Sequence, residues 1–195
     1  MVRYRRILDN YAAEGKPIIF SHELAQLAGN SPSQIRRDLM SCGCAGTTRA
    51  GYNVSEMQKN LKQVLGYSET KHTVLVGVGN LGKAILSYFS FRVPRVQVVA
   101  AFDVLPQRVG RVISGTRCHD VSELETIIHE KNVTLGVITV PREEAQPLAD
   151  RLVAAGVVGI LNFAPVTLKL PENVYVENMD ITMMIEKIAF YSGDK

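Results

Sequence analysis

The stretch Thr73-Val74-Leu75-Val76-Gly77-Val78-Gly79-Asn80-Leu81-Gly82 decides the fold of this chain. Its apolar first half predicts a buried β-strand, and its second half has the G-x-G-x-x-G spacing that leads from a strand into a helix in dinucleotide-binding proteins. Gly77 permits a tight turn, Gly79 lets the backbone approach a pyrophosphate, and Gly82 lets the helix lie close to the strand. The N–H groups at the start of that helix would attract phosphates. The alternative is a glycine turn with a purely structural role.

An acidic residue stands at the distance that this loop requires. A second strand, expected over 96–103, ends at Asp103, about 20 residues after Gly82. A carboxylate there typically accepts hydrogen bonds from ribose hydroxyls and repels a 2′-phosphate. This favours NADH and NAD+ over their phosphorylated counterparts, although Arg108, close behind Asp103, keeps the preference from being absolute.

The chain after Asp103 continues the same alternation of strands and helices. Strands are expected over 135–140, 159–162 and 174–176, with helices over 81–89, 121–131, 142–155 and 180–191. Unbroken apolar strands that alternate with helices predict a parallel sheet covered on both faces, which is a Rossmann-type α/β domain.

The residues that follow these strands should line the cofactor crevice, because ligands of such sheets bind at the carboxyl ends of the strands. Phe163 is expected to pack on a nicotinamide and Asn162 to bond its carboxamide, unless both serve ordinary loop structure. The predicted cofactor-binding residues are Gly77, Gly79, Asn80, Leu81, Gly82, Asp103, Thr139, Val140, Pro141, Asn162, Phe163 and Ala164.

The first third of the chain has a different pattern of short helices. Helices are expected over 3–13, from Ser21 to the Gly29-Asn30 turn, and over 32–41, where Ser31 caps the helix and Pro32 takes its first position. Two short helices joined by a tight turn form a helix-turn-helix, whose second helix enters the major groove of DNA. The alternative is a helical hairpin whose arginines face solvent.

A β-hairpin is expected over 46–52, which would be the wing of a winged helix-turn-helix domain with Arg49 at its tip. Arginine and glutamine side chains read guanine and adenine edges, and arginine also binds phosphates. The predicted DNA-binding residues are Ser33, Gln34, Arg36, Arg37, Arg49 and Tyr52.

The distribution of charge supports an anionic partner for this part of the chain. Residues 1–70 hold nine Lys and Arg against six Asp and Glu, whereas residues 71–195 hold thirteen of each, so the net charge of +3 lies in the first third. Basic charge confined to one domain suits nucleic acid.

Cysteine usage and hydropathy restrict where the protein works. Three cysteines, Cys42, Cys44 and Cys118, are too few for a disulfide framework and indicate a reducing compartment. The pair Cys42 and Cys44 lacks further ligands nearby, so no metal site is expected. No apolar run reaches the roughly 20 residues that span a bilayer. We therefore expect a cytoplasmic protein with no membrane partner.

The sequence offers little for an enzyme. A dehydrogenase needs an acid or base beside the nicotinamide. Only His119 is a candidate, and its loop is expected nearer the adenosine side. No substrate domain is seen after Asn162. Two alternatives to a DNA-binding sensor stay open, namely a small NAD-dependent oxidoreductase and a CoA-binding Rossmann module. The helix-turn-helix segment separates the sensor from both, and we expect no enzyme.

Three parts are predicted: a winged-helix domain over 1–70, a Rossmann domain over 71–177, and a C-terminal helix over 178–195. The last helix is apolar on nearly every side, and a helix of that kind must be buried. It packs either against another subunit or against its own sheet.

The order of these motifs resembles the Rex family of redox-sensing transcriptional repressors over nearly the whole chain. Joint occurrence in this order is far more specific than any one motif. The strings that carry the likeness are Ser31-Pro32-Ser33-Gln34-Ile35-Arg36-Arg37-Asp38-Leu39, Gly51-Tyr52-Asn53-Val54, the Gly77–Gly82 loop, Phe102-Asp103, Val140-Pro141 and Gly159-Ile160-Leu161-Asn162-Phe163-Ala164-Pro165.

The resemblance implies a homodimer with winged-helix heads, Rossmann domains and an exchanged C-terminal helix. It implies that NADH binding closes the dimer and releases operator DNA, whereas NAD+ competes weakly. By motif matching, Tyr88 and Asp180 look like the family's tyrosine and aspartate near the nicotinamide. Arg6 resembles a first-helix arginine that can pair with that aspartate, which would couple the cofactor pocket to the DNA-binding heads.

Overall fold

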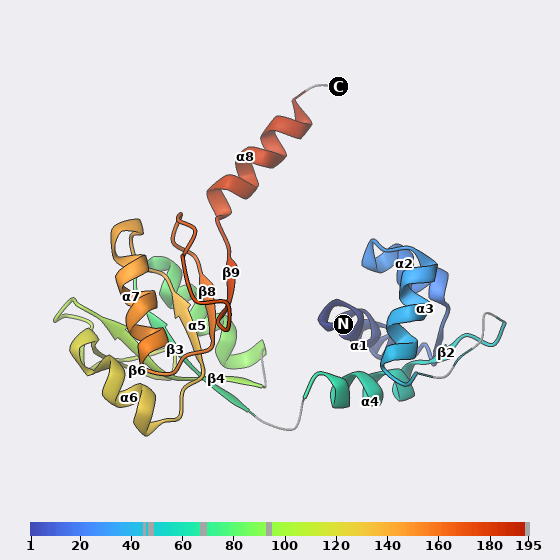
Figure 1. Cartoon of the computed structure of the whole chain (residues 1–195), viewed down its shortest axis with the longest axis horizontal. Coiled ribbons are helices and arrows are strands. Elements are labelled where there is room, and N and C mark those ends of the chain that lie inside the picture. Colours follow the sequence, from blue (N-terminus) through green and yellow to red (C-terminus); the bar gives the residue numbers. More distant parts are fainter. Residues whose placement is uncertain (45, 47–48, 67–69, 93–94, 194–195) are drawn as a thin grey trace. The chain divides into compact units, whose positions relative to one another are not determined.

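The computed structural model describes residues 1–44, 46, 49–66, 70–92 and 95–193. The chain divides into two compact units, Met1–Glu69 and Thr70–Lys195, each with its own core. Figure 1 shows the small helical unit and the larger unit built around a sheet.

The described residues of the first unit form four helices and a short two-stranded sheet. Its core is formed where the helices meet, by the fully buried Leu8, Leu24, Ile35, Leu39 and Leu61. The elements are α1 (Val2–Ala13), β1 (Ile18–Ile19), α2 (Ser21–Ala28), α3 (Pro32–Ser41), β2 (Tyr52–Asn53) and α4 (Val54–Val64).

The helix-turn-helix geometry follows from local signals. Gly29 ends α2 in the left-handed conformation with φ of 65°, which glycine adopts without steric cost. The hydroxyl of Ser31 then accepts a hydrogen bond from the Gln34 N–H at 3.2 Å and caps α3. Ile35 and Leu39, one turn apart on α3, are buried against the rest of the unit.

Tyr52, the last residue of the hairpin predicted over 46–52, takes part in a longer-range pairing. Tyr52 and Asn53 form β2, which pairs antiparallel with Ile19 and Ile18 of β1, far back in the sequence. Thr47 and Thr48, at the tip of the predicted hairpin, lie outside the described residues. The pairing of β1 with β2 could not be predicted because two-residue strands carry no periodic pattern.

The second unit has a seven-stranded sheet in the order β5-β6-β4-β3-β7-β8-β9, in which β5 is antiparallel and the other strands are parallel. Numbered along the chain, the six parallel strands follow the 3-2-1-4-5-6 order of dinucleotide-binding Rossmann sheets. The elements are β3 (Lys71–Val76), α5 (Asn80–Arg92), β4 (Val96–Asp103), β5 (Val112–Ile113), β6 (Thr116–Asp120), η1 (Val121–Glu123), α6 (Leu124–Glu130), β7 (Leu135–Ile138), α7 (Arg142–Ala154), β8 (Gly159–Asn162), β9 (Tyr175–Asn178) and α8 (Ile181–Ser192).

Side chains of β3 alternate between the two faces of the sheet. Val74 and Val76 pack in one cluster with residues of α6 and α7, whereas Leu75 packs in another with Ile85 and Leu86 of α5. The helices therefore lie on both sides of the sheet, as Figure 1 also shows. This architecture confirms the predicted Rossmann-type fold.

Strand β6 was not predicted, and the residues around His119 were expected to form a loop. In the structure β6 pairs in parallel with the end of β4, so Phe102 lies opposite His119 and Asp103 opposite Asp120. The stretch lacks an apolar run, but Thr116 and Cys118 alternate inward with Arg117 outward. Its strand conformation depends on the neighbouring β4.

Helix α8 has no buried residue within the chain. Its large apolar side chains are exposed, with Phe190 at 77% as the extreme. Asp180 caps it by accepting a hydrogen bond from the Met183 N–H at 2.9 Å. The alternative in which this helix packs on its own sheet is therefore wrong. Among the described residues, no helix is long and apolar enough to cross a membrane.

Candidate dinucleotide site and DNA-binding face

The glycine-rich loop joins β3 to α5 in a conformation that side chains would prevent. Gly77 has φ of 96°, and a Cβ atom there would lie 2.7 Å from the carbonyl oxygen of Thr139. A Cβ atom at Gly82 would overlap the carbonyl oxygen of Gly77. At Gly79, by contrast, a Cβ atom would meet nothing within 4 Å. The loop is thus tightly packed at its two outer glycines and open at Gly79, before the first turn of α5, which fits a diphosphate group.

Asp103 ends β4 with a carboxylate that is only 5% exposed. Its Oδ2 atom accepts hydrogen bonds from the Val78 N–H at 2.7 Å and from Arg108 Nη1 at 2.8 Å, and its Oδ1 accepts one from the Leu105 N–H at 2.9 Å. Burial by itself would raise the pKa of Asp103, but these donors outweigh it and hold the pKa below its ordinary value. The group is therefore an ionised acceptor, as ribose hydroxyls require.

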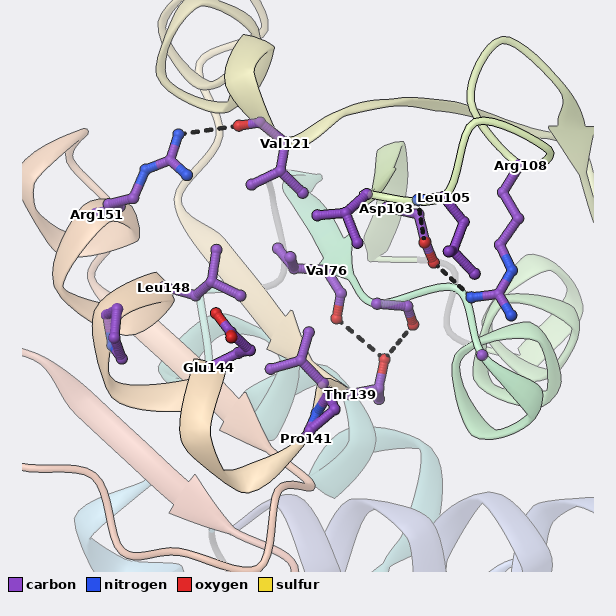
Figure 2. Close-up of a pocket in the computed structure, with 15 residues that line it drawn as sticks. Val76, Asp103, Leu105, Arg108, Val121, Thr139, Pro141, Glu144, Leu148 and Arg151 are labelled. Atoms are coloured by element: carbon purple, nitrogen blue, oxygen red, sulfur yellow. Dashed lines mark hydrogen bonds and ion pairs between the residues drawn. The ribbon is translucent and has the colours of Figure 1, made fainter.

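A cavity of about 740 Å³ lies at the carboxyl ends of β3, β4 and β7 (Figure 2). This is where the strand order reverses, which is the usual ligand position in such sheets. Thr139 lines this cavity. Its Oγ1 donates hydrogen bonds to the carbonyl oxygens of Gly77 at 2.6 Å and Val76 at 3.1 Å. The lining residues are Val76, Gly77, Gly79, Asp103, Val104, Leu105, Arg108, Val121, Thr139, Val140, Pro141, Glu144, Pro147, Leu148 and Arg151.

The far wall of the cavity combines apolar side chains with one ion pair. Arg151 on α7 makes two hydrogen bonds to Glu125, at 2.7 and 2.9 Å, and a third to the Val121 carbonyl oxygen at 2.9 Å. The hydrogen bond from Arg151 lowers the pKa of Glu125. Beside it, Val121 and Leu148 present apolar surface. Apolar walls with a few oriented polar groups, in a volume of this size, are typical of small-molecule sites.

Sequence reasoning missed this wall. Its residues belong to the segments after β6 and β7, not to the strand ends from which ligand-binding residues are usually predicted. They are Val121, Pro147, Leu148 and Arg151. A usable signal was the position of α7 directly after Pro141, since a helix that begins beside a lining residue has its first turns close to the same crevice.

The predicted residues after β8 contribute differently. Asn162 is fully buried, and it accepts from the Ala164 N–H at 3.0 Å and donates to Val166 and Asn178 at 2.7 and 2.9 Å. These bonds hold the turn between β8 and β9, so the predicted contact with a carboxamide stays a prediction that this geometry disfavours. Phe163 is half-buried and packs against the cluster beneath α5, and Ala164 is buried.

The three residues assigned to coupling have surface positions. Tyr88 on α5 is 45% exposed, and Arg6 on α1 is also exposed. Asp180 is half-buried and caps α8. Each is accessible within its own unit, and their predicted roles remain predictions.

The second helix of the helix-turn-helix, α3, divides its polar residues into two groups. Ser33 and Arg37 are exposed and lie one turn apart. Arg36 instead reaches Ser21, with Nη1 to Oγ at 3.4 Å. Gln34 donates from Nε2 to Asp38 Oδ1 at 2.6 Å. Ser33 and Arg37 thus face solvent, although the Ser33 hydroxyl lies 3.0 Å from that of Ser31, whereas Arg36 and Gln34 are oriented by other elements or residues of α3.

Asp38 is the centre of a network that links α3 to α1. Its Oδ2 accepts a hydrogen bond from the buried Tyr4 hydroxyl at 2.5 Å, and Asn30 donates to the Tyr4 oxygen at 2.9 Å. The bond from Tyr4 is the main reason that the pKa of Asp38 lies below its ordinary value. Asp38 thus remains ionised, and its Oδ1 accepts the hydrogen bond that the Gln34 side-chain amide donates.

The structure corrects one predicted DNA contact. Tyr52 is only 5% exposed and belongs to the core of the first unit, where a Cβ atom at Gly46 would strike its ring. The pairing of β2 with β1 turns this side chain inward, so it cannot reach DNA from this position. Arg49, by contrast, is exposed.

His119, the histidine considered for catalysis, lies on β6. Its Nδ1 is 3.5 Å from Glu123 Oε2, and its ring lies 5.9 Å from that of Phe102. Within the described residues, no group of three His, Cys, Asp or Glu side chains could hold a metal ion.

Two family models match this chain. Residues 68–166 match the model described as CoA binding domain, and residues 1–39 match the one described as Putative DNA-binding protein N-terminus. The first match agrees with the Rossmann fold of the second unit, and the second covers the segment from α1 through most of α3.

Proteins similar over nearly the full length carry a more specific description. The redox-sensing transcriptional repressor Rex of Syntrophobacter fumaroxidans is 41% identical over 96% of this chain and 90% of that protein. The Rex of Carboxydothermus hydrogenoformans is 39% identical with the same coverage. These relatives are named as repressors and not as enzymes.

A solved structure of similar fold was determined with both nucleotides. The repressor RSP in complex with β-NAD+ and operator DNA has a TM-score of 0.88 and 36% identity, covering 97% of this chain and 87% of that one. Its complex with β-NADH has a TM-score of 0.84 and 35% identity, covering 97% and 88%. RSP is described as a Rex-family repressor. With the glycine loop, Asp103 and the helix-turn-helix in the order that this family shares, the chain belongs to the Rex family of redox-sensing transcriptional repressors.

Proposed function

We propose that this protein is a transcriptional repressor that senses the ratio of NADH to NAD+ in the cytoplasm. It binds operator DNA through α3 while NADH is low and releases the DNA when NADH binds in the cavity beside Asp103. It performs no chemistry on the nucleotide, so it is not an enzyme.

One observation carries this proposal. A nucleotide cavity with an open Gly79 and an ionised Asp103 stands in the same chain as an α3 whose face exposes Ser33 and Arg37. Neither an oxidoreductase nor a CoA-binding module needs the second feature. The full-length likeness to named repressors favours the sensor over both alternatives.

The residues that would hold the cofactor have separable tasks. The N-terminus of α5 and the open Gly79 would receive the diphosphate. Asp103 would accept hydrogen bonds from the adenosine ribose, and the wall formed by Val121 and Leu148 would cover the adenine. Tyr88 and Asp180 would lie near the nicotinamide, where the reduced and oxidised forms differ in charge.

A switch needs two arrangements of the protein that the ligand binds with different affinity. We propose that the protein is a homodimer in which α8 is exchanged between subunits, since this helix exposes apolar side chains along its length. Asp180 at the start of α8 and Arg6 on α1 would pair in one arrangement and separate in the other.

Fluorescence anisotropy tests the function directly. Full-length protein is mixed with a labelled palindromic site selected from random DNA, and NADH and NAD+ are titrated separately at fixed salt, because phosphate contacts make affinity salt-dependent. We expect NADH to release the DNA at a far lower concentration than NAD+. A protein that never binds DNA, or that responds equally to both nucleotides, would refute the sensor.

A further inference from the structure

Helix α3 carries one large apolar side chain that its own domain leaves in water. Met40 is 75% exposed, whereas Ile35 and Leu39 on the opposite side of the helix are fully buried. All residues of α3 are described, and Met40 is the only large hydrophobic residue among them that is exposed. The domain core therefore does not account for a hydrophobic residue at this position.

Met40 lies on the face of α3 that is free to approach DNA. Side chains three and four residues apart share a face of a helix, so Ser33, Arg37 and Met40 form one row. All three are exposed, and the hydrogen bonds that hold Gln34 and Arg36 do not involve them. At a rise of about 1.5 Å per residue, the row is about 10 Å long, which is close to three base-pair steps of DNA.

The chemistry of the major groove offers one apolar partner for such a side chain. Base edges there present hydrogen-bond donors and acceptors, and the only apolar group is the 5-methyl of thymine. A methionine side chain is unbranched and polarisable, so it adapts to an apolar group of uncertain position more readily than a branched residue. A hydrogen bond to a base edge is excluded in practice, because a thioether is at most a weak acceptor.

We propose that Met40 is a specificity-determining residue that contacts a thymine 5-methyl group in the operator, one helical turn beyond Arg37. The proposal rests on the proposed binding of DNA by α3. Arg37 and Ser33 supply polar contacts, and Met40 adds a preference for thymine at one position in each half-site.

Replacing thymine by deoxyuridine tests this contact, since it removes the methyl group and leaves base pairing unchanged. A site is first selected from random double-stranded DNA with the full-length protein. Each thymine is then replaced singly by deoxyuridine, and affinity is measured for wild type, Met40→Ala, Met40→Leu and Val64→Ala. Val64 is a control because it is an exposed apolar residue at the end of α4.

At one thymine per half-site, we expect deoxyuridine to weaken wild-type binding about four-fold, the value for one buried methyl group. Met40→Ala should bind thymine and deoxyuridine equally, whereas Met40→Leu and Val64→Ala should keep the wild-type difference. Equal binding by wild type at every thymine would overturn the proposal, and so would discrimination that survives in Met40→Ala.

The failure of this proposal can be told from failure of the proposed function. If wild type selects a site and Arg37→Ala abolishes binding while the deoxyuridine scan is flat, α3 binds DNA and only the role of Met40 is wrong. If wild type selects no DNA at all, both are wrong.

Discussion

Arg108 Nη1 lies 2.8 Å from Asp103 Oδ2, and both residues of this ion pair line the cavity at the ends of β3, β4 and β7. The arginine thus contacts the same carboxylate that ribose hydroxyls would need (Figure 2). The pair would let one site prefer an unphosphorylated ribose although it holds a cation. While Asp103 is present, Arg108 would be neutralised and a 2′-phosphate would meet a carboxylate.

Asp103→Asn should change which dinucleotide binds. The neutral amide is a weaker acceptor for the ribose and no longer neutralises Arg108, so NADH affinity should fall by about 1.5–3 kcal/mol while NADPH affinity rises. Fluorescence titration with both nucleotides measures the change. The double variant Asp103→Asn with Arg108→Ala should lose the gain for NADPH, and a gain that persists there would show that Arg108 is not its cause.

Lowering the pH should reduce the free energy of unfolding of the Rossmann unit, in part because Asp103 becomes protonated. Its folded-state pKa lies below that of the unfolded chain, so its contribution to the free energy of unfolding is present above about pH 4 and disappears as pH falls through the lowered value. Urea unfolding of the Asp103→Asn variant should therefore show a shallower loss of stability below about pH 4 than wild type. Glu172→Gln, at an exposed loop position, is the control and should follow wild type.

The glycine loop allows a matched pair of substitutions. Gly82→Ala should lower the free energy of unfolding by about 1–3 kcal/mol, because the new methyl group overlaps the Gly77 carbonyl oxygen and pushes α5 from the sheet. Gly79→Ala has room for its methyl group and should unfold as wild type does, yet bind NADH more weakly. Thermal unfolding and NADH titration separate the two effects. Equal destabilisation by both variants would contradict this assignment.

The Tyr4–Asp38–Gln34 network should matter for stability and for base preference. Tyr4→Phe removes the hydrogen bond from the Tyr4 hydroxyl to the partly buried Asp38 carboxylate. It should lower the free energy of unfolding, measured in urea, by about 1–2 kcal/mol.

Asp38→Asn should change how the Gln34 side chain is oriented. An asparagine can donate as well as accept hydrogen bonds, so it no longer requires the Gln34 amide to point its nitrogen toward position 38. Discrimination at one operator base pair should therefore relax. A binding profile over all single-base variants of the site measures this. An unaltered profile would mean that Gln34 does not read a base.

Helix α8 should control the oligomeric state. Ile185 and Ile188 are exposed and one turn apart, so the double change Ile185→Glu and Ile188→Glu would place charge where a partner subunit is expected to cover them. Sedimentation equilibrium should show a dimer for wild type and a monomer for the variant. Ser192→Ala, at the end of the same helix, is the control. If wild type itself is a monomer at micromolar concentration, the exchange of α8 is excluded.

Features of the chain that depend on a few neighbouring residues were determined by the sequence alone. The turn at Gly77, the start of α3 at Ser31-Pro32 and the position of Asp103 at a strand end all follow from local backbone preference and spacing. The alternation of strands and helices in the Rossmann unit was predictable for the same reason, because these elements, with the exception of β6, carry their own hydrophobic period.

Features that depend on residues far apart in the sequence were decided by the tertiary structure. The burial of Tyr52 results from the pairing of β2 with β1, and β6 is a strand because β4 lies beside it. The apolar wall with Arg151 and the bond between Gln34 and Asp38, supported by Tyr4, are likewise set by packing. Burial and hydrogen-bond partners are properties of a neighbourhood in space, and no local pattern specifies which distant residue will fill it.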